Sequence, residues 1–489
     1  MEDDRFLFPE TESQSQKAHV VSKSYSSGSF YGAPSTIFWA CLGFSWVVYL
    51  WDLYLSLREL KAQRNAKKIP VSLQQSITKE EFEKSREYTL DKSVFGMLTG
   101  VVNQIETTLI LLLNGMPWLW KVSGELQPLR FGPLGTEICQ TLVFLTLSQI
   151  LETIISLPFS YYKTFVIEER HGMNKQTLGY FFKDMIKKFF VFNVVISNIV
   201  VPLLIYVIHI GGDYAFFYAW LFCVVVFLFI STIYQDYIAP IFDTYKPVPE
   251  GELRTSIEAL TNKLRFPLHR LYIVEGSKRS AHANAYFFGM FNKKTIVLFD
   301  TLFGTEEKPV QSAKPSETAT DPLSNRDSEI KGDKEVALGC SNQEIVAVLS
   351  HELGHWSLGH FWKNILISMT SLLVSFSVFG FLYRNQAIFS AFGFYNEQPT
   401  IIGLVIILQY IYAPANEILS FAMTQLSRMF EFQADSFAKK LNAAEALKGA
   451  LIKLNQTNKG FPVHDWLYSM FNHSHPTLEQ RLAALGKTE

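Results

Sequence analysis

The chain has 489 residues, of which 48% are hydrophobic, 15% aromatic and only 18% charged. Soluble proteins carry more charge, so this composition indicates that much of the chain lies in lipid. The net charge of −1 provides no basic field for nucleic acid, and the four cysteines include no CxxC pair, so neither a disulfide framework nor a cysteine zinc site is indicated.

Two polar stretches are predicted to be disordered. Residues 1–34 are rich in serine and acidic side chains and contain no apolar run, which predicts a disordered tail and not a signal peptide. Residues from about 304 to 341 are polar, charged and contain several prolines and serines. We expect this second stretch to be a disordered insertion without catalytic residues.

Seven apolar runs have roughly the length that crosses a membrane. We expect transmembrane helices over residues 35–57, 93–118, 137–162, 189–211, 214–237, 362–383 and 400–423. The loops 58–92 and 163–188 are rich in lysine and arginine, and basic loops remain in the cytosol. The predicted organisation is therefore a lumenal tail, five spans, a cytosolic segment, two spans and a second cytosolic segment, over residues 1–34, 35–240, 241–361, 362–423 and 424–489.

Several predicted spans are too polar to face lipid on all sides. Their polar side chains are Asn103, Gln104, Glu106, Gln140, Glu152, Asn193 and Asn198. Such groups either form hydrogen bonds between helices or line a water-filled cavity. Their number favours a hydrated chamber.

Strands are predicted between the fifth and sixth spans. Residues Arg270–Val274 and Thr295–Phe299 alternate apolar and polar positions, and the stretch between them could be the middle strand of a small antiparallel sheet. If that strand is instead an edge, the main chain at Asn284, Ala285 and Tyr286 could bind an extended peptide substrate. Plain sheet structure is the alternative.

The sequence His351-Glu352-Leu-Gly-His355 carries the strongest chemical signal. Two histidines four residues apart lie on one face of a helix and can bind zinc together. Glu352 occupies the position at which such sites carry the carboxylate that takes a proton from the metal-bound water. A catalytic zinc site needs one more protein ligand and leaves a position for water.

Two residues compete for the third ligand position. His360 lies nine residues after His351, whereas the extended histidine motif requires ten, and a continuous helix would turn it to the far face. We therefore expect His360 to be a structural or surface residue. Glu431 is the better candidate because spans six and seven form a hairpin that returns the chain beside the motif. Asp435, one turn later, can accept the free N–H of a ligating histidine, although Glu431 could instead pair with Arg428 on a solvated helix face.

Several motifs in a fixed order resemble the integral-membrane CaaX prenyl proteases, or type 1 CaaX endopeptidases, whose animal members include the zinc metalloprotease that processes prelamin A. The motifs are Phe165–Gly172, Pro249–Leu253, Gly276–Ser280, Asn284–Gly289, Ile296–Asp300, His351–Trp356 and Glu431–Asp435. The resemblance runs from about residue 35 to the C-terminus and includes little of the predicted tail and insertion.

The resemblance implies an all-α polytopic membrane protein with seven transmembrane helices around a large chamber and a cytosolic zinc-metalloprotease domain, which would carry the small antiparallel sheet. It implies one Zn²⁺ per chain, a location in the endoplasmic reticulum membrane and inner nuclear membrane, and an active site facing the cytosol and nucleoplasm. The implied substrates are prenylated CaaX proteins, which lose their last three residues, with a second upstream cleavage as in prelamin A maturation.

Site residues of the family correspond to positions in this chain. The zinc ligands, the base and the carboxylate partner of a ligand correspond to His351, His355, Glu431, Glu352 and Asp435. His475 matches a histidine at the metal site that could help to hold the oxyanion. Arg481 matches a nearby arginine whose role the resemblance leaves open.

Two other functions fit parts of the pattern. An intramembrane protease that cuts transmembrane helices would carry its motif inside an apolar span, whereas polar residues 341–344 lead into the motif here. A membrane scaffold without activity would have lost a ligand or Glu352, and all of these residues are present. A scaffolding role beside catalysis stays open.

Overall fold

The computed structural model describes residues 34–127, 132–290, 292–303 and 339–486. The predicted tail and insertion fall almost wholly on residues 1–33 and 304–338, which lie outside the described residues.

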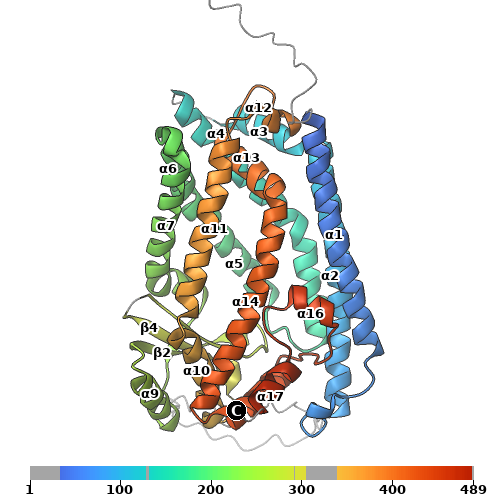
Figure 1. The fold of residues 1–489 in the computed structure, drawn as a ribbon, viewed down its shortest axis with the longest axis vertical. Coiled ribbons are helices and arrows are strands. Elements are labelled where there is room, and N and C mark those ends of the chain that lie inside the picture. The colour runs from blue at the N-terminus through green and yellow to red at the C-terminus, as the bar shows by residue number, and fades with distance from the viewer. Residues whose placement is uncertain (1–33, 128–131, 291, 304–338, 487–489) are drawn as a thin grey trace, which may run out of the picture.

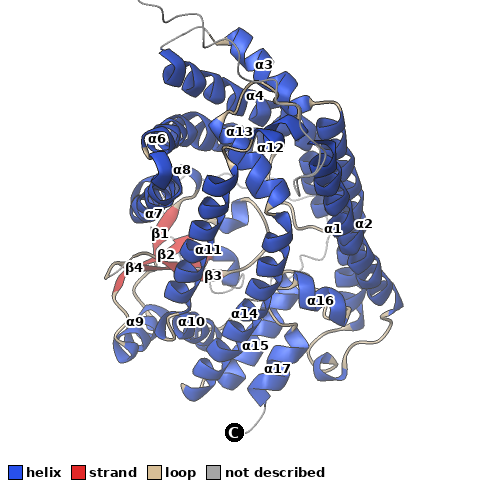
Figure 2. Cartoon of the chain, turned by 45° about the horizontal axis from the view of Figure 1, so that its top comes forward, coloured by secondary structure: helices blue, strands red, loops and turns tan. Residues whose placement is uncertain are grey.

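The described chain is mainly helical, with one small sheet (Figures 1 and 2). Its helices are α1 Pro34–Asn65, α2 Lys79–Leu112, α3 Gly115–Leu126, α4 Gly132–Tyr162, α5 Leu178–Phe189, α6 Ser197–Ile210, α7 Ala215–Ile233, α8 Ala239–Phe242, α9 Glu252–Leu264, α10 Asn342–Ser357, α11 His360–Leu382, α12 Gln386–Ala391, α13 Thr400–Val405, α14 Ala413–Lys440, α15 Ala444–Thr457, α16 Trp466–Asn472 and α17 Leu478–Gly486. Its strands are β1 Tyr245–Pro247, β2 Leu268–Val274, β3 Ala285–Phe288 and β4 Lys294–Phe299.

Six helical stretches within the described residues are long and apolar enough to cross a membrane. They are Ser35–Asn65, Lys79–Leu112, Gly132–Glu168, Leu178–Ile210, Gly212–Ile233 and His360–Leu382. A bent pair gives a seventh candidate span: Thr400–Ile411 and Ala413–Lys440 pass the same test together but are bent by 64°. Pro414 lies in the first turn of α14, where its missing N–H ends the preceding helical hydrogen-bond pattern. Seven spans were expected, and the bend is an addition to that prediction.

The spans bury little of their apolar surface within the protein. Only 6% to 12% of the apolar window of each straight span is buried, so most of these residues stay accessible at the protein surface, as in helices that contact lipid. Polar residues of the spans line a pocket and also connect neighbouring helices. Asn103 and Gln104 line a pocket of about 340 Å³ together with Asp52 and Glu417, and Gln104 also donates a hydrogen bond to Ser45 Oγ on α1.

The sheet is mixed, which corrects the expectation of an antiparallel sheet. Its strand order is β1-β2-β4-β3, and β2 and β4 run parallel. Parallel neighbours need a crossover connection of about a dozen or more residues, which the segment between Val274 and Lys294 provides. Strand β3 lies within that connection and pairs with the outer side of β4. It is therefore an edge strand and not the predicted middle strand.

Helix α10 is held between the sheet and α14. Its N-terminus is fixed by a capping box, in which Ser341 Oγ accepts from the Glu344 N–H and the Glu344 carboxylate accepts from the Ser341 N–H. Apolar side chains of α10 share one buried core with the sheet, α9 and α15. The fully buried members of that core include Ile257, Ile296, Leu298, Leu349, Leu353 and Leu447. This packing gives the histidine motif a rigid support.

Candidate metal centre and active site

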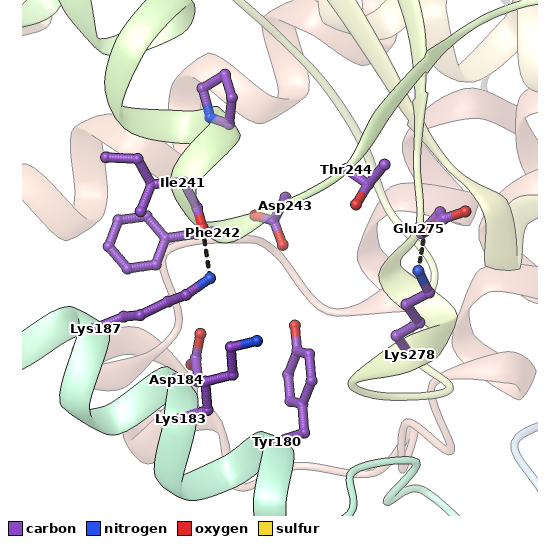
Figure 3. Close-up of a pocket in the computed structure, with 11 residues that line it drawn as sticks. Tyr180, Lys183, Asp184, Lys187, Ile241, Phe242, Asp243, Thr244, Glu275 and Lys278 are labelled. Atoms are coloured by element: carbon purple, nitrogen blue, oxygen red, sulfur yellow. Dashed lines mark hydrogen bonds and ion pairs between the residues drawn. The ribbon is translucent and has the colours of Figure 1, made fainter.

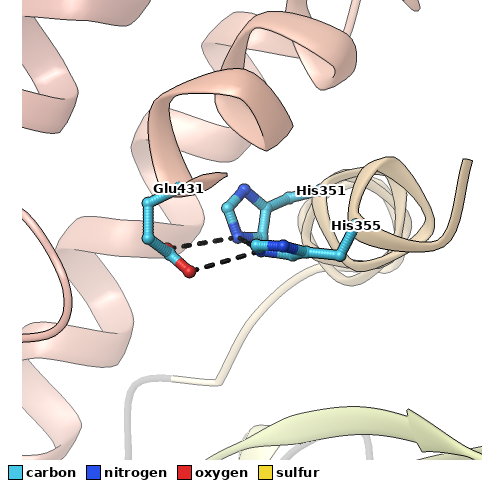
Figure 4. Close-up of side chains that lie close together, drawn as sticks. All are labelled: His351, His355 and Glu431. Atoms are coloured by element: carbon cyan, nitrogen blue, oxygen red, sulfur yellow. Dashed lines mark hydrogen bonds and ion pairs between the residues drawn. The ribbon is translucent and has the colours of Figure 1, made fainter. Parts of the chain in front are cut away.

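The three residues proposed as ligands lie together. His351 and His355 are one turn apart on α10, and Glu431 approaches from α14 (Figure 4). The two Nε2 atoms are 3.3 Å apart. Glu431 Oε2 is 3.5 Å from His351 Nε2, and Oε1 is 3.3 Å from His355 Nε2. The helices can approach so closely because Gly354 faces α14, where a Cβ would lie 3.2 Å from Ala434 Cα.

These separations fit a metal ion. Four tetrahedral ligands at about 2.0–2.1 Å from zinc lie about 3.3–3.4 Å from one another. Glu431 Oε2 is buried and has no hydrogen bond of normal geometry within the described residues, although His475 Nδ1 lies 2.9 Å away. A buried carboxylate oxygen without a well-formed hydrogen bond destabilises the folded protein unless a cation balances its charge. Among the described residues, this is the one group of three such side chains whose ligand atoms all lie within 4.8 Å.

The carboxylates make the site attractive to a cation. Burial opposes charge on Glu431, but contacts with His351, His355 and His475 outweigh it and hold the pKa of Glu431 far below its usual range. Burial also opposes a proton on His351, yet Asp435 and Glu431 outweigh this effect and raise the pKa of His351 to about 9. A metal ion would take the place of such a proton, since ligating histidines are neutral.

Asp435 and Arg481 orient His351. His351 Nδ1 lies 2.8 Å from Asp435 Oδ1, so its Nδ1–H points to the carboxylate and its Nε2 lone pair points to Glu431. Arg481 donates two hydrogen bonds to Asp435, from Nε at 2.9 Å and from a terminal nitrogen at 2.7 Å. Burial raises the pKa of Asp435, but the contacts with His351 and Arg481 outweigh it and keep the carboxyl ionised.

Glu352 follows His351 directly on α10 and is partly buried. Burial raises the pKa of its carboxyl, and the charges of His351 and His355 oppose this rise. A carboxylate with a raised pKa holds an abstracted proton better than an exposed one, which suits acid–base chemistry near neutral pH.

Arg428 does not form the alternative pair with Glu431. Its guanidinium donates to the carbonyl oxygens of Ser469 and His473, at 3.2 and 3.3 Å, and to Gln480 Oε1 at 3.0 Å. These contacts hold the segment 469–480 against α14. That segment carries His475, whose side chain is 67% exposed and so remains accessible beside Glu431.

His360 lies at a different position from the one predicted. Helix α10 ends at Ser357, and Gly359, with a φ of +69°, starts a new helix in a different direction. The expectation of a far-face position assumed one continuous helix and is wrong. His360 is buried, with its Nδ1 2.9 Å from His355 Nδ1. A glycine just after a helix is a known C-terminal signal and could have indicated the break.

The predicted peptide-binding residues lie on the sheet edge beside α10. Strand β3 pairs with β4 on one side, so the main chain of Ala285 points outward on the other, although its N–H is already bonded to a side chain. Asn284 Oδ1 accepts from the Ala285 N–H at 2.8 Å, and the Tyr286 ring lies in the same strand. Sequence analysis missed Asn458, whose side-chain amide bonds both main-chain groups of Ala283, at 2.8 and 3.2 Å.

A separate pocket of about 250 Å³ lies between α5, the end of α8 and the turn after β2 (Figure 3). Most of its charges are balanced within the protein. Lys278 pairs with Glu275, and Asp184 pairs with Arg279 at 2.9 Å. Lys187 donates to a main-chain carbonyl at 3.0 Å. This pocket therefore offers no ligand set comparable with the His351 group.

Comparisons with known proteins agree with this geometry. Residues 59–244 match the family model of the CaaX prenyl protease N-terminal region with five membrane helices, and residues 247–489 match peptidase family M48. The chain is 51% identical to the human CaaX prenyl protease 1 homologue over 461 residues, covering 93% of this chain and 96% of that protein. It is 33% identical to the CaaX prenyl protease 1 of Saccharomyces cerevisiae over 467 residues, covering 91% and 94%.

The crystal structure of Ste24p from S. mikatae superposes with a TM-score of 0.80 at 32% identity, covering 92% of this chain and 98% of that one. Fold, metal-binding geometry and sequence thus lead to one conclusion. The chain is a membrane metalloprotease that belongs to the CaaX prenyl protease family within peptidase family M48.

Proposed function

We propose that this protein is a zinc metalloendopeptidase that removes the last three residues from prenylated CaaX proteins. The observation that supports this most directly is the group formed by the buried His351 and Glu431 and the half-buried His355, beside Glu352. The relatives named CaaX prenyl proteases match the chain over nearly its whole length. We extend the proposal to a second upstream cleavage, as in prelamin A maturation.

The proposed location is the endoplasmic reticulum and inner nuclear membrane, with the active site facing the cytosol and nucleoplasm. The motif helix α10 is not one of the membrane spans, but α11 is a span and begins three residues after α10 ends. The active site would thus lie at the membrane surface, next to the chamber. A prenylated substrate fits this place, because each buried CH₂ of a lipid chain contributes about 0.8 kcal/mol. An intramembrane protease would carry its motif within a span.

The proposed chemistry assigns a role to each side chain. His351, His355 and Glu431 would hold the zinc ion, which when bound would supply a Lewis acid for the scissile carbonyl and for a water molecule. Glu352 accepts the proton from the attacking water and passes it to the leaving nitrogen. Asp435 fixes the ring of His351, and Arg481 fixes Asp435. Attack by water needs no covalent bond between the enzyme and the peptide.

Two further groups would contact the substrate. The accessible ring of His475, whose Nδ1 lies 2.9 Å from Glu431 Oε2, would donate a hydrogen bond to the oxyanion that develops on the scissile carbonyl. The free edge of β3, at Asn284, Ala285 and Tyr286, would bind the peptide as an added strand. Main-chain pairing makes few demands on side chains, which suits a protease that accepts varied residues at the two a positions.

The test is cleavage of a farnesylated CaaX peptide by the purified full chain, with wild type compared with Glu352→Gln. We expect wild type to release the tripeptide and the variant to lose activity by about a hundredfold or more, which is the range for a general base. Metal content measured on both proteins should stay at one zinc per chain, because Glu352 is not a ligand.

Two controls separate the parts of the proposal. The same peptide without the farnesyl group should be a poorer substrate. Wild type that binds zinc but leaves the farnesylated peptide intact would contradict the substrate assignment and leave the metal site standing. Wild type that binds no zinc would overturn the proposed mechanism.

A further inference from the structure

His355 has a hydrogen-bonding partner of its own at the metal centre. Its Nε2 faces His351 and Glu431, and its Nδ1 lies 2.9 Å from His360 Nδ1. The second ring nitrogen of His360, Nε2, lies 2.9 Å from Gln433 Oε1. Three side chains from three helices, α10, α11 and α14, thus form one chain of hydrogen bonds that ends at a proposed ligand.

The chain of hydrogen bonds determines which ring nitrogens carry protons. The amide oxygen of Gln433 can only accept, so the proton of a neutral His360 must be on Nε2. His360 Nδ1 is then an acceptor, and the shared proton must come from His355 Nδ1. This leaves the lone pair of His355 on Nε2, the nitrogen that faces the other two ligands. A proton on Nε2 would make His355 unable to bind metal.

Packing holds this arrangement in place. The His360 side chain is only 2% exposed, and its ring stacks on Phe430 with centroids 4.0 Å apart and planes 7° from parallel. Phe430 precedes Glu431 on α14. The stacking therefore connects the position of His360 directly to the helix that supplies the third ligand.

We propose that His360 and Gln433 are positioning residues, which fix the orientation and tautomer of His355 for metal binding. They do for His355 what Asp435 and Arg481 do for His351. The inference rests on the proposed zinc site. It assigns a role to two residues that are neither zinc ligands nor substrate contacts.

The test measures zinc affinity by competition with a chelator of known affinity, using the full-length protein in detergent. His360→Phe keeps an aromatic ring on Phe430 but cannot accept a hydrogen bond. It should raise the zinc dissociation constant by about 10- to 100-fold, the usual effect of losing such a partner. His360→Asn places an amide oxygen near the former Nδ1 and should recover most of the affinity. The matched control is His269→Phe, because His269 lies on an exposed position of β2.

Gln433 variants test the direction of the hydrogen bonds. Gln433→Glu can only accept and should preserve zinc affinity, whereas Gln433→Lys can only donate and should weaken it. Weaker binding by Gln433→Glu would show the opposite orientation and overturn the proposal. Unchanged affinity in His360→Phe would also overturn it, while a wild type without zinc would overturn the proposed function as well. The thermal unfolding temperature of each chelated variant shows whether the fold is intact.

Discussion

Gly354 determines how closely the two ligand-bearing helices approach, and Gly354→Ala tests this directly. A Cβ at this position would lie 3.1 Å from Phe437 Cβ and 3.2 Å from Ala434 Cα. Both neighbours are on α14, and Ala434 lies about one turn after Glu431. The added methyl group cannot be accommodated by a side-chain rotation, because one of its contacts is main chain.

The size of the effect follows from these distances. Carbon atoms pack at about 3.5–4.0 Å, so α14 must move away from α10 by roughly 0.5 Å. Metal sites tolerate deviations of about 0.2 Å from their preferred distances. We therefore expect zinc affinity to fall by at least about tenfold, a loss in the range known for disturbed metal surroundings. Overpacking should lower the free energy of unfolding by about 1–3 kcal/mol. The higher helix propensity of alanine should offset about 1 kcal/mol of this loss.

The assay is zinc competition together with thermal unfolding, with and without chelator. Gly96→Ala is the matched control, since Gly96 is also within a helix and a Cβ there meets nothing within 4 Å. The control should bind zinc like wild type. If Gly354→Ala binds zinc and cleaves peptide like Gly96→Ala, the helix separation does not set the ligand geometry and the reasoning is refuted.

Two further variants address the sheet edge and the contact between α1 and the C-terminal segment. Asn458→Ala removes both bonds to Ala283 and should raise the KM for peptide with unchanged zinc content, whereas an unchanged KM would show that β3 does not bind substrate through its edge. Burial raises the pKa of Asp465, but hydrogen bonds from Arg58 and from main-chain N–H groups outweigh it and hold the pKa below its usual value. The ionised Asp465 therefore stabilises the folded state at any pH above the unfolded-state pKa of about 3.9. This stabilisation is lost as the pH falls through the lower pKa of the folded state. Asp465→Asn should therefore lower the unfolding temperature at neutral pH, with a difference that shrinks in acid; a difference that persists there would contradict the Arg58 ion pair as its cause.

Local patterns were enough to predict the histidine pair of the proposed metal centre, but not its third ligand. The spacing of His351 and His355 depends only on helix geometry, so the sequence indicated their common face. Glu431 required a topological step, namely that a helical hairpin returns the chain beside the motif, and α14 does lie there (Figure 1). The same helix period placed Asp435 one turn after Glu431 as the partner of a ligating histidine, and the structure identifies that histidine as His351.

Strand pairing could not be predicted in the same way. Alternation identifies a strand but contains no information on its neighbour or direction, which depend on contacts across the sheet. The stretches that became β2, β3 and β4 follow one another in sequence, which favoured a simple antiparallel order. In the structure, β4 lies between β2 and β3 and is almost fully buried. The free energy gained by burying the apolar side chains of β4 in the core with α10 outweighs the entropic advantage of the shorter connections in an antiparallel meander.

Two breaks in helices explain both what was missed and how the active site is built. Without the turn at Gly359, α10 would continue into α11 and His360 would point away from His355. Without the bend before Pro414, α14 would follow the direction of Thr400–Ile411, and Glu431 would not reach α10. The turn at Gly359 lies between α10 of the protease region and the span α11, whereas the bend before Pro414 lies within the bent seventh span, between Thr400–Ile411 and α14. The metal centre is therefore attached on both sides to membrane helices, so movements of α11 or α14 act directly on the positions of the proposed ligands.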